Sequence, residues 1–138
     1  DLQRLEEVEF VPFHRLADEG IDLMMVGHIT MPNVTDDGLP ASLSKEAIDL
    51  LREELDYDGI VITDAMNMGA IVNYYPDGEA AVKAVEAGGD IVLWPADLDD
   101  AYNSLCEAVQ TGEISEKRLD ESVERILSLK YDKGMLVP

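Results

Sequence analysis

Three short apolar runs, each preceded by a glycine, constrain the fold of this chain more than any other feature of its sequence. They cover residues 21–29, 60–63 and 90–95. Runs of this length, rich in β-branched residues, are typical of buried strands. The stretches between them have helical periodicity, and the runs begin about 35 residues apart, the size of a strand–helix unit. This alternation predicts an α/β fold in which a parallel sheet is covered on both faces by helices.

Capping residues and 3.6-residue periodicity predict where the helices lie. The predicted helices cover residues 12–19, 44–55, 79–87, 99–111 and 115–133. Before the second of them, residues 30–43 form a long loop, and loops of this length in compact domains are usually functional. The predicted strands number three, which is too few to close a barrel. An open sheet leaves hydrophobic edges exposed, so we expect the chain to self-associate through them.

Composition excludes several classes of partner and site. Thirty acidic against ten basic residues give a formal net charge of −20, which repels nucleic acid and anionic lipid. No run reaches the ~18 apolar residues that a membrane helix needs. The single cysteine cannot form an internal disulfide, and the two histidines have no metal-motif spacing, so we expect no metal and no cofactor. The first residues lack a signal-peptide pattern, so either there is none or the chain is part of something longer.

The middle apolar run ends at Thr63 and Asp64, where a carboxylate follows side chains that belong in a core. In α/β proteins the loops that carry chemistry gather at the carboxyl ends of the strands. Asp64 is therefore a candidate catalytic residue. Aspartate is also a preferred N-cap, so Asp64 could instead begin the next helix, and position alone does not separate the two interpretations.

Several motifs occur in one order along the chain. They are Met24–Ile29, Pro40–Ser44, Leu51–Leu55, Tyr57–Met68, Ala87–Ile91 and Ser122–Leu127 followed by Lys130, together with Pro12-Phe13 near the start. In this order they resemble the family 3 glycoside hydrolases, specifically the bacterial β-N-acetylhexosaminidase branch. The resemblance covers nearly the whole chain, which makes it far more specific than any one motif.

The resemblance implies a fold and a catalytic residue. The catalytic domain of that family is a (β/α)8 TIM barrel, and this chain is similar only to its last portion, about three parallel strand–helix units. Residues 1–138 would then be a single fragment of such a barrel. The family's nucleophile, the aspartate of a Thr-Asp pair, corresponds to Asp64. A retaining glycosidase needs such an ionised carboxylate, together with an acid/base group that is usually a second carboxylate ~5–5.5 Å away.

The resemblance also implies that part of the machinery lies upstream. In the hexosaminidase branch the acid/base group is a histidine on a mobile loop that precedes the matched part, and neither His14 nor His28 has that sequence context. The expected function is therefore that of a fragment of a retaining β-N-acetylhexosaminidase or β-glycosidase. It would carry the nucleophile for a β-linked carbohydrate substrate but be inactive alone.

Three other residues are candidates for sugar contacts at the same strand ends. His28 ends the first run and is a candidate substrate-binding residue, or alternatively a hydrogen-bonded structural histidine. Met68 follows Asp64, and its thioether could pack on a sugar face or fill the core. Trp94 ends the third run and could stack on a sugar or be buried at the rim.

Two noncatalytic alternatives belong to a different functional class. A receiver-type phosphoacceptor module also places an aspartate at the end of a central parallel strand. That site needs an acidic pair after the first strand and a lysine after a later one, whereas this chain has Gly27-His28 and Trp94-Pro95 there. The other alternative is a structural module that completes the barrel of another chain.

Overall fold

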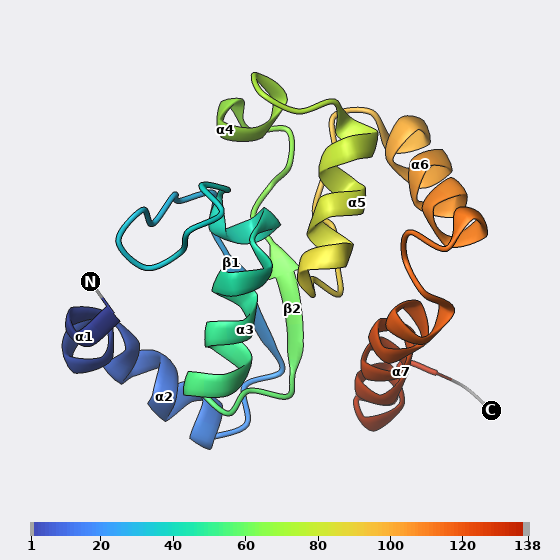
Figure 1. Ribbon diagram of the computed structural model, residues 1–138. Coiled ribbons are helices and arrows are strands. Elements are labelled where there is room, and N and C mark those ends of the chain that lie inside the picture. The colour runs from blue at the N-terminus through green and yellow to red at the C-terminus, as the bar shows by residue number, and fades with distance from the viewer. Residues whose placement is uncertain (1, 137–138) are drawn as a thin grey trace.

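The chain forms a two-stranded parallel sheet with helices packed against one of its faces (Figure 1). The structure, a computed structural model, describes residues 2–136. The amino-terminal helical stretch is α1 (Leu2–Arg4), a π-helical segment (Leu5–Glu9) and α2 (Phe10–Asp18). The elements that follow are β1 (Leu23–Val26), a 3₁₀ turn (Ala41–Leu43), α3 (Lys45–Glu54), β2 (Ile60–Thr63), α4 (Gly69–Val72), α5 (Asp77–Ala87), α6 (Leu98–Thr111) and α7 (Glu116–Asp132).

Four of the five predicted helices agree with α3, α5, α6 and α7 to within two residues at each end. Their caps explain the agreement. The hydroxyl of Ser44 accepts a hydrogen bond from Ala47 N at the start of α3, and that of Ser115 accepts one from Arg118 N at the start of α7. Gly88 ends α5 in the left-handed conformation, with a φ of 116°. The first helix is longer than predicted, because helical backbone extends from Leu2 to Asp18.

Within residues 2–136 the sheet has two strands rather than the predicted three. β1 and β2 pair in parallel with Leu23 opposite Ile60 and Val26 opposite Thr63. The strand predicted over residues 90–95 is wrong, since of these six residues only Ile91 forms a bridge, to Ile62. Beyond that bridge the hydroxyl of Thr63, not a backbone carbonyl, accepts the hydrogen bond from Leu93 N at 3.0 Å. A side chain therefore ends the ladder, although residues 90–94 still run beside β2.

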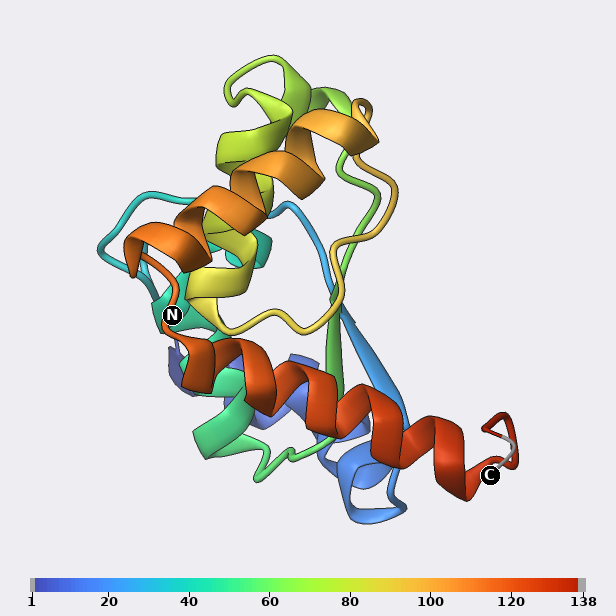
Figure 2. The ribbon, with the colours of Figure 1, turned by 90° about the vertical axis from the view of Figure 1, so that its right-hand side faces the viewer.

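Helices cover one face of the sheet, so the prediction that both faces are covered is wrong for the described residues. Side chains alternate along a strand, and Met24 and Val61 face the helices. The core cluster there comprises Met24, Ile48, Leu55, Tyr57, Val61 and Ala87. In Figure 2 helices α3, α5 and α6 gather on one side of the strands. On the other side, which we call the open face, Leu23 is 38% and Met25 53% exposed.

Helix α5 joins two further core clusters. One packs it against the loops around β2 and contains Leu43, Met66, Ile71, Ala80 and Ala84. The other packs it against α6 and contains Val82, Val85, Ala108 and Ile114. The approach of α5 to α6 requires Gly78, because a Cβ there would collide with the side chain of Ser104.

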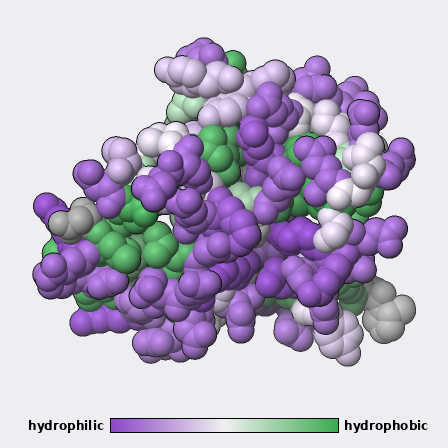
Figure 3. Space-filling view, viewed as in Figure 1, coloured by the Kyte–Doolittle hydropathy of each residue, from purple (hydrophilic) through white to green (hydrophobic). Residues whose placement is uncertain are grey.

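The surface is mostly hydrophilic, as the high content of acidic residues requires (Figure 3). In that view a hydrophobic area lies over the amino-terminal helices. The exposed apolar residues of this stretch include Val8, Phe13 and Leu16. Among the described residues, none of the helices combines the length and the apolar character needed to cross a membrane.

Candidate functional site

Asp64 lies directly after β2 and continues the ladder by one residue. Its backbone N–H donates to the carbonyl oxygen of Val26 at 2.9 Å. Because side chains alternate along an extended strand, Asp64 lies on the same face as Ile62, which is the open face. Its neighbour Thr63 points the other way and is only 1% exposed. The half-buried carboxylate therefore stands at the carboxyl end of the sheet, on the side that the helices leave uncovered.

The Asp64 carboxylate does not cap a helix. Its Oδ1 accepts a hydrogen bond from the N–H of the next residue, Ala65, at 2.7 Å. Within residues 2–136 its Oδ2 has neither a hydrogen bond nor an ion pair. The next helix, α4, begins at Gly69 with Met68 in the N-cap position and no side-chain cap. The helix-cap interpretation is therefore wrong, and one carboxylate oxygen is free of protein partners.

His28 connects two loops at this end of the sheet. Its Nε2 lies 3.0 Å from the carbonyl oxygen of Ala65, and its Nδ1 lies 2.7 Å from the hydroxyl of Ser42. A carbonyl can only accept, so Nε2 carries a hydrogen, and in the neutral ring Nδ1 accepts from Ser42. His28 thus ties the loop before α3 to the residue that follows Asp64. Its substrate-binding role stays a prediction, and in this structure both ring nitrogens are engaged within the protein.

The two methionines after Asp64 have different environments. Met66 is 1% exposed and belongs to the core cluster with Leu43 and Ile71. Met68 is 44% exposed at the start of α4. Met66 therefore fills the core, whereas Met68 is available at the surface. Contact between Met68 and a sugar stays a prediction.

Trp94 is exposed and conformationally strained. Its side chain is 70% exposed, so it is not buried at the rim in this structure. Its φ of 49° lies in the left-handed region, which costs a non-glycine residue about 1–2 kcal/mol. The backbone on both sides is held by the Asp64 loop: Met66 N donates to Leu93 O at 2.8 Å, and Asn67 N donates to Trp94 O at 3.1 Å.

Asp90 is a buried carboxylate, not predicted from the sequence, that joins β2 to two helices through hydrogen bonds and ion pairs. The side chain of Asp90 is fully buried. Its Oδ2 accepts hydrogen bonds from Val61 N at 2.9 Å and from Arg52 Nη2 at 3.0 Å. Its Oδ1 accepts from the Ser122 hydroxyl at 2.5 Å and from Arg125 Nη1 at 3.1 Å. This network, which we call the Asp90 cluster, connects β2 to helices α3 and α7.

A second arginine of α7 completes the Asp90 cluster. Arg118 lies 3.7 Å from Asp90 and donates to the hydroxyl of Ser122 at 2.8 Å and to the carbonyl of Gly89 at 2.8 Å. A sequence signal for the cluster exists. Arg118, Ser122 and Arg125 are spaced i, i+4, i+7, which places them on one face of the predicted last helix. The spacing places the three side chains together, but it does not by itself show that they face a buried acid rather than solvent.

Burial changes the proton affinities of the groups around Arg52. Desolvation lowers the pKa of the Arg52 guanidinium, and nearby Arg125 adds to this, while Asp90 opposes it. The Arg52 guanidinium donates to the carbonyls of Tyr57 and Gly59, and it lies 5.6 Å from the centre of the Tyr57 ring. Burial raises the pKa of Tyr57 to about 12. The phenol therefore stays neutral, and it donates to Ile60 O at 3.1 Å.

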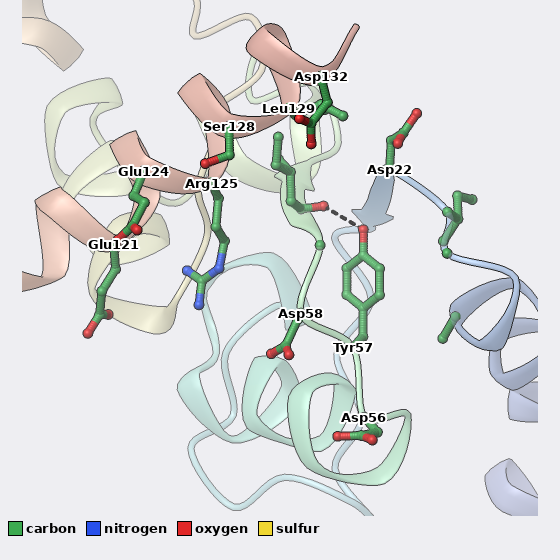
Figure 4. A pocket seen from close by; sticks show the side chains of 15 residues that line it. Asp22, Asp56, Tyr57, Asp58, Glu121, Glu124, Arg125, Ser128, Leu129 and Asp132 are labelled. Atoms are coloured by element: carbon green, nitrogen blue, oxygen red, sulfur yellow. Dashed lines mark hydrogen bonds between the residues drawn. The ribbon is translucent and has the colours of Figure 1, made fainter.

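A pocket of ≈ 600 Å³ opens at the opposite end of the strands from Asp64 (Figure 4). Its lining includes Asp22, Asp58, Glu124 and Asp132, which come from the strand starts and from α7. Figure 4 shows these carboxylates spread around the pocket rather than converging on one point. Across residues 2–136, no group of three or more histidine, cysteine, aspartate or glutamate residues is arranged to hold a metal ion.

Comparisons with known proteins point to one family. Residues 1–129 match the glycosyl hydrolase family 3 N-terminal domain. The chain is 34% identical over 126 residues to a β-N-acetylglucosaminidase/β-glucosidase of Cellulomonas fimi, covering 84% of this chain and 22% of that protein. It is 36% identical over 134 residues to the β-hexosaminidase LpqI of Mycobacterium tuberculosis, covering 88% of this chain and 33% of that protein.

Solved structures agree with the sequence matches. A family 3 β-N-acetylglucosaminidase from Paenibacillus superposes with a TM-score of 0.92 at 43% identity, covering 96% of this chain and 26% of that one. The structure of M. tuberculosis LpqI superposes with a TM-score of 0.83 at 33% identity, covering 91% of this chain and 38% of that one. The chain therefore spans less than two fifths of the length of each of these relatives.

Proposed function

Because this chain belongs to glycosyl hydrolase family 3, in its bacterial β-hexosaminidase branch, we propose that Asp64 is the nucleophile of a retaining β-N-acetylhexosaminidase or related β-glycosidase. The chain would supply the last strand–helix units of that enzyme's (β/α)8 barrel. Its open face would then be the side turned toward the barrel interior. The exposure of Leu23 and Met25 on that face supports this proposal, since apolar residues of a barrel interior are normally covered.

The observation that carries the proposal is the state of the Asp64 carboxylate. A glycosidase nucleophile must be ionised and must have an oxygen free to attack the anomeric carbon. Asp64 stands at the carboxyl end of β2 with Oδ1 held by Ala65 N, while its other oxygen has no partner within residues 2–136. The one hydrogen bond orients the group, and the second oxygen stays available for bond formation.

We propose that the isolated chain has negligible hydrolase activity. His28 is the histidine nearest in sequence to the strand ends, and its ring nitrogens are already engaged by Ser42 and Ala65. The acid/base histidine that the resemblance implies precedes the matched part, so the proton donor would come from outside this chain, and loss of general acid catalysis alone costs about 10²–10⁴ in rate. The test is an assay of this chain with a chromogenic β-N-acetylglucosaminide. Turnover near that of a full-length relative would overturn the proposal.

The proposed partner is a β-linked N-acetylglucosaminide or other β-glycoside. The net charge of −20 disfavours nucleic acid and anionic membranes as partners. Family membership also removes the receiver-type alternative, because the matched sequence extends over nearly the whole chain. The structural barrel-completing module is separated from the catalytic proposal by the substitution of Asp64 discussed below.

We also propose that the isolated chain self-associates through the free edge of β1 and the open face. β1 pairs with β2 on one side only, and Leu23 and Met25 are exposed beside that edge. Because the acidic surface opposes association, the effect should grow as salt screens the charge. Sedimentation equilibrium at low and high salt checks this. A monomer at every concentration and salt level would contradict it.

A further inference from the structure

The single tryptophan of the chain is part of the loop cluster around Asp64, not of the hydrophobic cores. Hydrogen bonds from Met66 N to Leu93 O and from Asn67 N to Trp94 O connect its backbone to the residues two and three positions after Asp64. Its indole is 70% exposed. A large apolar ring is therefore exposed on a segment whose backbone is hydrogen-bonded to the loop that follows Asp64.

The backbone of Trp94 is unusual in two ways. Its φ of 49° is one that bulky L residues rarely adopt, and it precedes Pro95, where an extended conformation is preferred. Such strain persists only where the surroundings enforce it, and it concentrates at functional sites. Here the hydrogen bonds to the loop after Asp64 hold the Trp94 backbone in this conformation. Leu23 and Met25 of the open face are also exposed, but their backbone is regular strand.

We propose that Trp94 is a stacking platform for a pyranose ring bound beside Asp64, an assignment that rests on the proposed glycosidase function. The C–H face of a pyranose is apolar, and an indole offers a large rigid surface that loses little conformational freedom on binding. The hydrogen-bonded backbone fixes where the Trp94 side chain leaves the main chain before the sugar arrives. Contact with the sugar face also explains the solvent exposure of an apolar side chain in this position.

The experiment is a titration of this chain with N,N′-diacetylchitobiose, read by tryptophan fluorescence. Since Trp94 is the one tryptophan, its emission is free of background from other indoles. We expect a saturable shift to shorter wavelength and protection from acrylamide quenching. The matched control is Tyr131→Ala, which removes another aromatic side chain of 70% exposure, on α7, and leaves the fluorescence response unchanged.

A second variant separates sugar binding from a structural role. Trp94→Gly removes the indole and relieves the left-handed strain, so we expect an unchanged or higher melting temperature together with sugar binding at least about tenfold weaker by saturation-transfer NMR. Equal sugar binding by wild type and Trp94→Gly would overturn the proposal.

The same NMR measurement distinguishes the two proposals. Saturation transfer to the sugar, with tryptophan emission unaffected, would overturn the role of Trp94 and leave the proposed carbohydrate substrate intact. No saturation transfer from the wild-type chain at millimolar sugar would overturn the role of Trp94, while the nucleophile proposal would still be decided by Asp64→Asn in an enzyme that contains this chain. Saturation transfer together with the emission shift, and its loss in Trp94→Gly, would support both.

Discussion

Replacing Asp64 by asparagine in an enzyme that contains this chain is expected to lower kcat for β-N-acetylglucosaminide hydrolysis by at least about 10³-fold. Asparagine has nearly the same shape and retains an oxygen that can accept the hydrogen bond from Ala65 N. The fold should therefore be unchanged, while the charge and the nucleophilic oxygen are lost. Initial rates with a chromogenic β-N-acetylglucosaminide, with melting temperature measured alongside, check the prediction.

Two further variants make the Asp64 test specific. Asp64→Ala leaves space for a small anion, so azide is expected to restore part of the rate and to yield a glycosyl azide, which a purely positioning residue would not do. Asp99→Asn is the matched control, because Asp99 is an exposed carboxylate in the first turn of α6. Activity of Asp64→Asn within about tenfold of wild type would favour a structural barrel-completing module instead.

Asp90→Asn is expected to destabilise the chain by about 3–5 kcal/mol. The substitution keeps the size of the side chain but removes the negative charge that compensates Arg52 and Arg125, which lie 3.0 and 3.1 Å from it. Because Asp90 is fully buried, water cannot reach this position to solvate the guanidinium groups that lose their partner. A domain of this size has a total stability of about 5–15 kcal/mol. Urea unfolding followed by circular dichroism should therefore show a large fall in the midpoint.

The control for the Asp90 cluster is Asp120→Asn on α7. Asp120 is exposed, and its substitution is expected to change stability by no more than about 0.5 kcal/mol. Ser122→Ala should give an intermediate loss of about 1–3 kcal/mol, because it removes the hydroxyl that Asp90 and Arg118 share. A loss below about 1 kcal/mol for Asp90→Asn, with an unchanged denaturant slope, would show that the cluster contributes little net stability.

Local patterns predicted four of the five helices to within two residues and located both paired strands, although β1 (Leu23–Val26) is shorter than the predicted run over residues 21–29. Helices α3 and α7 have Ser44 and Ser115 as N-cap residues, whose hydroxyls accept hydrogen bonds from the first turn as such residues do in other proteins. The β2 strand is an uninterrupted β-branched run, and its end at Thr63 and Asp64 was evident from the change in polarity. These features depend on neighbours within a few residues, which is why sequence alone reveals them.

Apart from the length of the first helix, the wrong predictions involve contacts between residues far apart in the chain. The strand predicted over 90–95 has the right composition, yet its ladder ends because the Thr63 side chain takes the hydrogen bond of Leu93 N. The role of Asp90 depends on Arg52 from one helix and Arg125 from another, and no local period encodes that meeting. The uncovered face of the sheet was not predicted either. The apolar composition of the strands does not indicate how many helices pack against the sheet.

From the order of its residues alone, this chain shows its family, its alternation of strands and helices, and the aspartate that closes the middle strand. Family motifs and capping patterns involve residues close together in the sequence, so they can be identified without a structure. The folded molecule was needed to show that one Asp64 oxygen has no partner within residues 2–136, that His28 is engaged by Ser42 and Ala65, and that Asp90 is buried among arginines. Each of these depends on which distant groups meet, and that is settled by packing in three dimensions.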